Sequence, residues 1–183
     1  MKRFASVIIA GLMIIYPLIA VVLLKHFSPI WLILALVFAL TFRLWLGGKS
    51  APLSMIVASI AAIIGISVTA VYDQELSIRL YPVFMGGAIL VAFLVSLIRP
   101  PSMIERFARL AEPDLPPHAV RYTYKVTILW CVFIALNLVV ALWTVLYAST
   151  EVWAIYNGAI AYALMGILFL SELVYRKFIR KAE

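Results

Sequence analysis

The stretch VTILWCVFIALNLVVALWTVLY, residues 126–147, decides the class of fold because it contains no charged residue. A helix needs about 20 consecutive apolar residues to cross the roughly 30 Å hydrocarbon core of a bilayer. This run therefore predicts a transmembrane helix.

Five further stretches are similarly long and apolar: residues 4–24, 29–46, 53–71, 81–98 and 153–175. We expect six transmembrane spans in a single integral membrane domain covering residues 1–183. Proline is compatible with the first turn of a helix, so Tyr81-Pro82 is expected to begin the fourth span. The predicted fold class is an all-α, polytopic transmembrane helical bundle.

The composition excludes a water-soluble domain of this size. Of the 183 residues, 66% are hydrophobic and 13% are charged, against about 45–50% and 25% in an average soluble domain. The formal net charge of +7 favours contact with anionic surfaces.

The basic residues are distributed unequally between the two sides of the predicted bundle. If the N-terminus is cytoplasmic, only Lys25 and Arg79 lie on the outer side. The cytoplasmic side then holds Lys2, Arg3, Arg43, Lys49, Arg99, Arg106, Arg109, Arg121, Lys125, Arg176, Lys177, Arg180 and Lys181. Because short cytoplasmic loops are rich in Lys and Arg, we expect a multi-pass protein of the bacterial inner membrane with both termini in the cytoplasm.

The loop between the fourth and fifth spans predicts a short interfacial helix. Ser102 and Glu105 have the spacing of a capping box, and prolines from Pro113 onward end the helix. Its expected apolar face holds Met103, Ile104, Phe107 and Leu110, and its polar face holds Glu105, Arg106 and Arg109. Such a helix lies at the lipid headgroups.

Four arginines near this helix are candidates for contact with anionic headgroups or with a partner protein: Arg99, Arg106, Arg109 and Arg121. A basic residue near an anionic surface contributes about 1 kcal/mol to membrane binding. The alternative interpretation is that these residues only fix the topology.

Asn137 lies near the middle of span 126–147, where an amide needs a hydrogen-bonding partner. It either joins two helices or lines a polar cavity for a cargo. The cavity hypothesis adds Tyr16 and Tyr162 as further lining residues.

The remaining acidic candidates lie near the ends of spans. Glu172 is within the last predicted span, where carboxylates are functional candidates, but Arg176 follows at the spacing of a helical ion pair. Asp73, Glu75 and Arg79 share the predicted outer loop, which we interpret as a solvated turn rather than an acid and base pair.

The sequence contains no motif for catalysis, a cofactor, a metal or nucleic acid. Cys131 is the only cysteine, and the two histidines, His26 and His118, fall on opposite sides of the predicted membrane. Gly47-Gly48-Lys49-Ser50 lacks the leading glycine and the preceding strand of a phosphate-binding loop. We therefore expect a protein that is not an enzyme.

The second half of the chain resembles a family of uncharacterised small bacterial membrane proteins associated with aryl-polyene and other fatty-acid-type gene clusters. The residues that carry the resemblance are Arg99–Leu110, Glu112–Pro117, Arg121-Tyr122-Thr123, Trp130–Phe133 and Leu136-Asn137. The layout is also similar to that of the inner-membrane septation protein A family. These resemblances imply a role in the cell envelope and supply no catalytic residues.

Two functions are compatible with these observations. The first is a non-enzymatic inner-membrane protein that supports envelope lipid homeostasis, within a larger assembly or as a homo-oligomer. The second is a small flippase or transporter subunit for a lipid-like cargo, with aryl-polyenes as one candidate.

Overall fold

The computed structural model describes residues 16–24, 26–47 and 53–176, and every regular element in these ranges is helical. After helical residues 16–24 come α2 (Pro29–Gly47), α3 (Leu53–Tyr72), α4 (Gln74–Ile98), α5 (Met103–Ala111), α6 (Pro117–Tyr147), α7 (Thr150–Ile155), the π-helical segment η2 (Tyr156–Ile160) and α8 (Ala161–Val174). The predicted all-α class is confirmed. The first half of span 4–24 and the basic tail after Arg176 lie outside the described residues.

Three helical segments are long and apolar enough to cross a membrane: Gln74–Ile98, Pro117–Tyr147 and Thr150–Val174. The apolar parts of α2 and α3, Pro29–Phe42 and Ser59–Tyr72, are shorter. Large apolar side chains are exposed along the long helices, for example Val139 at 67% and Ile167 at 63%. Soluble monomers rarely expose extensive apolar surface, so these faces are suited to lipid.

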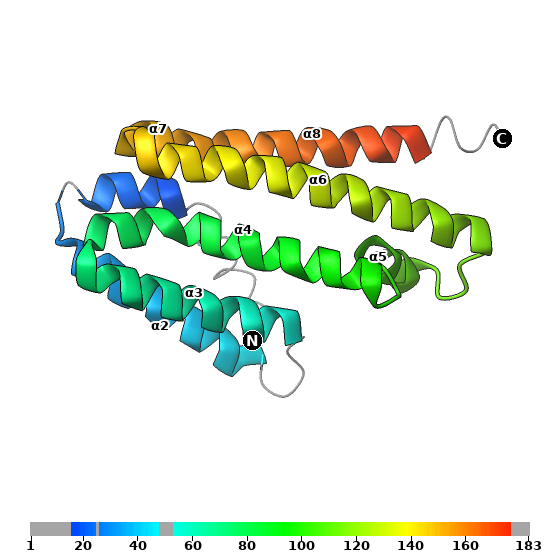
Figure 1. The fold of residues 1–183 in the computed structure, drawn as a ribbon, viewed down its shortest axis with the longest axis horizontal. Coiled ribbons are helices and arrows are strands. Elements are labelled where there is room, and N and C mark those ends of the chain that lie inside the picture. Colours follow the sequence, from blue (N-terminus) through cyan, green and yellow to red (C-terminus); the bar gives the residue numbers. More distant parts are fainter. Residues whose placement is uncertain (1–15, 25, 48–52, 177–183) are drawn as a thin grey trace.

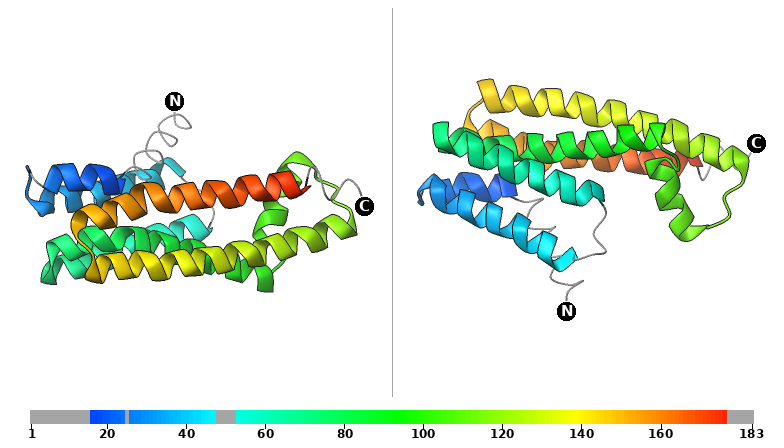
Figure 2. Two further views of the ribbon diagram at one scale, coloured as in Figure 1. Left: turned by 90° about the horizontal axis from the view of Figure 1, so that it is seen from above. Right: turned by 60° about the horizontal axis from the view of Figure 1, so that its bottom comes forward.

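The long helices run side by side along the longest axis of the molecule (Figure 1). Helix α4 packs against both α3 and α6, and α2 packs against α3 and α4. We call the end where α6 passes into α7 the α7 end, and the opposite end, where α4 leads into α5, the α5 end. Both views in Figure 2 show α5 running across the direction of the long helices.

Helix α4 corrects the expected start of the fourth span. It begins at Gln74, and the Asp73 carboxylate caps it by accepting the backbone N–H of Leu76 at 3.0 Å. Pro82 is therefore inside the helix rather than in its first turn. The cap adds two helical turns, which contain the polar residues that the hydropathy pattern assigned to a loop.

The main apolar core lies toward the α7 end. Trp153 is fully buried there, together with Leu40, Ile66 and Ile78. The cluster extends along α4 only as far as Met85, and from α6 it includes only Val145. Buried residues at the α5 end, among them Ser96, Thr123 and Thr127, lie outside this apolar cluster.

Candidate functional site

Hydrogen bonds to both neighbouring helices hold the N-terminus of α5 in place. The backbone N–H of Met103 donates to Ser96 Oγ of α4 at 2.9 Å, and that of Ile104 donates to Thr127 Oγ1 of α6 at 3.2 Å. Ser102 and Glu105 form the predicted capping box, in which Glu105 accepts the Ser102 N–H. The N–H groups that a helix start leaves unpaired thus position α5 across the bundle.

The structure corrects the predicted polar face of α5. Glu105 is buried, and its Oε1 accepts hydrogen bonds from Arg109 Nε and Nη2 at 2.9 and 2.8 Å. Arg109 also donates to the Pro113 carbonyl oxygen. Periodicity placed Glu105 outward because it takes no account of the helices that pack against α5, which are α4 and α6.

The other candidate arginines are exposed at the α5 end. Arg106 donates to the carbonyl oxygens of Pro101 and Arg99 and so orders the turn that precedes α5. Arg99 and Arg121 are exposed as well, at the end of α4 and near the start of α6. The four arginines therefore come from three consecutive elements at one end.

Two large apolar side chains of α5 are exposed. Phe107 is 57% exposed and Leu110 is 84% exposed. Ile104, one turn before them, is half-buried. A transverse helix with this outward apolar surface and basic neighbours has the features of a helix that lies in a membrane interface.

A groove of about 620 Å³ lies between α5, the start of α6 and the end of α8. Its apolar lining consists of Ile104, Phe107, Ala108, Ala111, Leu115 and Ala119. Its polar lining consists of Glu112, His118, Tyr122, Thr123, Glu172 and Arg176. This groove is the candidate site.

Within the groove, Glu172 has a different partner from the expected one. Glu172 Oε1 accepts a hydrogen bond from the Tyr122 hydroxyl at 3.1 Å, and the Tyr122 ring stacks on Tyr175 at 6.3 Å. Among the described residues, Glu172 forms no ion pair with Arg176. The predicted helical pair is therefore absent, and a contact between α6 and α8 is present in its place.

The three residues of the predicted cargo cavity have separate surroundings. The Tyr16 hydroxyl donates to the Ile78 carbonyl oxygen, and its ring packs edge-on against Tyr81. Asn137 Oδ1 accepts from the Tyr156 hydroxyl at 2.8 Å. The Tyr162 side chain is 36% exposed. These contacts give Tyr16 and Asn137 structural partners on different helices.

At the α7 end, hydrogen bonds of Arg79 join α4 to the end of α6 and to α7. Arg79 Nη2 donates to the carbonyl oxygens of Thr144 and Ala148, each at 2.7 Å. Trp153 Nε1 donates to the Arg79 carbonyl oxygen at 3.0 Å. The interpretation of residues 73–79 as a solvated turn was therefore wrong for Arg79.

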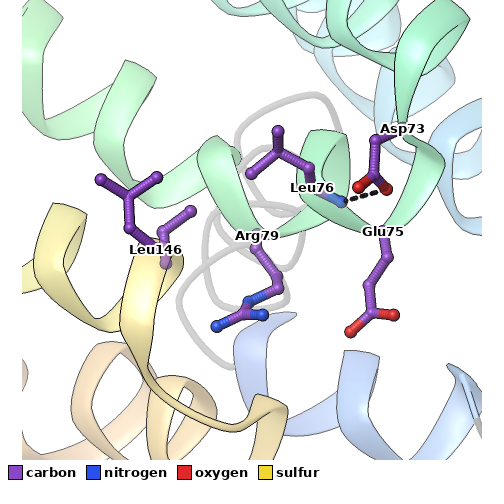
Figure 3. Close-up of a pocket in the computed structure, with 6 residues that line it drawn as sticks. Asp73, Glu75, Leu76, Arg79 and Leu146 are labelled. Carbon is purple, nitrogen blue, oxygen red and sulfur yellow. Dashed lines mark hydrogen bonds between the residues drawn. The ribbon is translucent and has the colours of Figure 1, made fainter.

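A smaller pocket of about 290 Å³ lies beside Arg79. Figure 3 shows the Arg79 side chain extending from α4 between Leu146 and Glu75. Glu75 Oε1 accepts from the Thr150 hydroxyl at 2.7 Å, and Asp73 caps α4. Glu75 and Arg79 of this pocket thus join α4 to α7 and to the end of α6.

Sequence reasoning missed the groove because its walls are distant in sequence. Tyr122 and Glu172 are 50 residues apart, and no local pattern pairs them. Within the described ranges, no three His, Cys, Asp or Glu side chains gather as metal ligands would. Comparison with known protein families, curated proteins and solved structures finds no match. The family resemblance therefore stays a prediction.

Proposed function

We propose that this chain is a non-enzymatic, six-span protein of the bacterial inner membrane that supports envelope lipid homeostasis through contact with phospholipid headgroups. The observation that carries the proposal is α5, which crosses the bundle end with Phe107 and Leu110 exposed. The exposed arginines Arg99, Arg106 and Arg121 lie at this same end.

Helix lengths support an interfacial position for α5. Arg79 and Arg99 are separated by 20 residues of α4 and its cap, which corresponds to about 30 Å of helix. That length matches the hydrocarbon thickness of about 30 Å. The two arginines would then lie at opposite interfaces, with α5 at the Arg99 side.

The orientation of α4 across the membrane is tested by labelling single cysteines. In a Cys131→Ala background, Gln74→Cys and Asp114→Cys place a thiol at exposed positions beside Asp73 and after α5. We expect an impermeant thiol reagent to label Gln74→Cys from outside and Asp114→Cys only after permeabilisation. Labelling of both from one side would overturn the topology.

The functional proposal is tested with the pair Phe107→Ser and Leu110→Ser in a deletion strain. We expect loss of normal envelope lipid composition at unchanged protein level, because α5 loses two exposed apolar side chains, of which Phe107 also lines the groove. The matched control is Val71→Ser with Tyr72→Ser, which are 81% and 87% exposed at the α7 end. Full complementation by the α5 pair would contradict the proposal.

The alternative proposal, a flippase or transporter subunit for a lipid-like cargo, requires Asn137, Tyr16 and Tyr162 to line one cavity. The hydrogen bonds of Asn137 to Tyr156 and of Tyr16 to Ile78 favour roles in helix packing. The groove at the α5 end is therefore the better-supported location for lipid contact.

A further inference from the structure

We infer that the groove at the α5 end binds one phospholipid with a primary-ammonium headgroup, such as phosphatidylethanolamine, with Glu172 facing the ammonium and Arg176 the phosphate. This inference rests on the proposed function, because it names a specific lipid for the end that contacts headgroups. It adds a defined site to the general attraction between basic residues and anionic lipid.

The position of the groove along the helices places it at the level of the lipid headgroups. Glu172 follows Thr150 by 22 residues in the segment Thr150–Val174, which is about 33 Å of helix. Tyr122 precedes Tyr147 by 25 residues in α6, which is about 38 Å. If the α7 end lies at one interface, both side chains therefore reach the opposite interface, just beyond about 30 Å of hydrocarbon.

The groove is lined by charges of both signs, the carboxylates of Glu112 and Glu172 and the guanidinium of Arg176, as a zwitterionic headgroup requires. Glu172 is half-buried, and its Oε2 accepts no hydrogen bond from the residues that the structure describes. A primary ammonium supplies a positive charge and three N–H donors to this carboxylate. Arg176 lines the same groove, and a guanidinium suits a phosphate geometrically.

The apolar residues of the groove are suited to contact the glycerol backbone and acyl chains of a phospholipid. Ile104, Phe107 and Ala108 line the groove on the α5 side. An acyl chain or glycerol backbone could lie against them while the headgroup faces Glu172. Phosphatidylglycerol offers no cation to this carboxylate, and phosphatidylcholine offers a cation without N–H donors, so both fit less well.

Lipid retention by the full chain tests the inference. Delipidated protein in detergent is titrated with a methylation series: phosphatidylethanolamine, its mono- and dimethylated forms, and phosphatidylcholine. Phosphatidylglycerol is the comparison lipid without a cation, and all the lipids carry the same acyl chains. Bound lipid is counted by native mass spectrometry. We expect the apparent Kd to rise with each methyl group, by about tenfold or more across the series, because charge-assisted hydrogen bonds are lost. Equal affinities across the series would overturn the inference without requiring any variant.

Variants locate the site. Glu172→Gln keeps an oxygen acceptor for Tyr122 and should bind phosphatidylethanolamine as weakly as phosphatidylcholine. Arg176→Gln should weaken the binding of both lipids equally, because both carry the phosphate. The control Glu75→Gln, at the α7 end, should retain the full preference. A Glu172→Gln variant that still discriminates would overturn the assignment.

The outcomes separate this inference from the function on which it rests. Retention of phosphatidylglycerol without any preference for phosphatidylethanolamine would overturn the inference and leave the lipid-contact function in place. Failure of the wild-type chain to retain any phospholipid would count against both.

Discussion

The Tyr16 hydroxyl lies 3.5 Å from the carbonyl oxygen of Ile78, the helical acceptor that Pro82 leaves without a donor. In a regular helix the N–H of residue 82 would donate to residue 78, and proline has no N–H. Ile78 is fully buried and Tyr16 is 9% exposed, so water is a poor substitute. The N-terminal segment therefore compensates for a proline in the interior of α4.

Tyr16→Phe is expected to destabilise the protein by about 1 kcal/mol, because the Ile78 carbonyl then has no donor. In a Pro82→Ala background the same substitution should cost close to nothing, because the restored N–H of residue 82 supplies the donor. The measurement is a double-mutant cycle on thermal unfolding in detergent. Equal costs in the two backgrounds would refute the compensation.

Asn137→Leu and Tyr156→Phe are expected to have similar, modest effects, because each removes the same hydrogen bond between α6 and η2. Interhelical hydrogen bonds in membranes average about 0.6 kcal/mol. Thermal unfolding in detergent measures the stability change, and complementation of a deletion strain measures function. We expect complementation to be retained by both variants.

Loss of complementation by a stably folded Asn137→Leu variant would instead favour the carrier hypothesis. Tyr156→Phe separates the two cases further. If Asn137 contacts a cargo, the tyrosine substitution should leave function intact while the asparagine substitution abolishes it.

Arg109→Gln is expected to destabilise the protein by about 1–3 kcal/mol, because it leaves the buried Glu105 carboxylate without its charged partner. Glu105→Gln combined with Arg109→Gln should cost less than the sum of the single changes. Hydrogen exchange of the α5 amides measures the local effect. Arg106→Gln is the control, because within the described part of the chain Arg106 donates only to carbonyl oxygens of the preceding turn.

Local signals in the sequence predicted α5 well. The capping box at Ser102 and Glu105 and the later prolines fix the helix without help from other elements. The same local view failed at Glu105, because spacing within one helix takes no account of the neighbouring elements α4 and α6. It also failed at Pro82, because the Asp73 cap and the Tyr16 hydroxyl together make a proline acceptable inside a helix.

The groove could not be predicted for a related reason. Hydropathy identifies which segments are apolar, but it does not identify which helices become neighbours. Tyr122, Glu172 and Ile104 come from three separate elements. The sequence around each of these residues is typical of a protein surface or of a membrane interface. The packing of α5 against α6 and the contacts of Tyr122 with the end of α8 bring them together.

Arg79→Met is expected to lower stability by about 1–3 kcal/mol, because the carbonyl oxygens of Thr144 and Ala148 lose a charged donor. These carbonyls belong to the C-terminal end of α6 and the residue after it, where a positive charge also interacts favourably with the helix dipole. Arg79→Lys should recover part of the loss, because it keeps the charge but not the guanidinium. Thermal unfolding in detergent measures the series.

Arg121→Met is the matched control for this series, because Arg121 is an exposed arginine near the other end of α6. A surface substitution of this kind changes stability by about 0.5 kcal/mol or less. If Arg79→Met and Arg121→Met were equally mild, the hydrogen bonds of Arg79 would contribute little, and the α7 end would owe its stability to the apolar core around Trp153 alone.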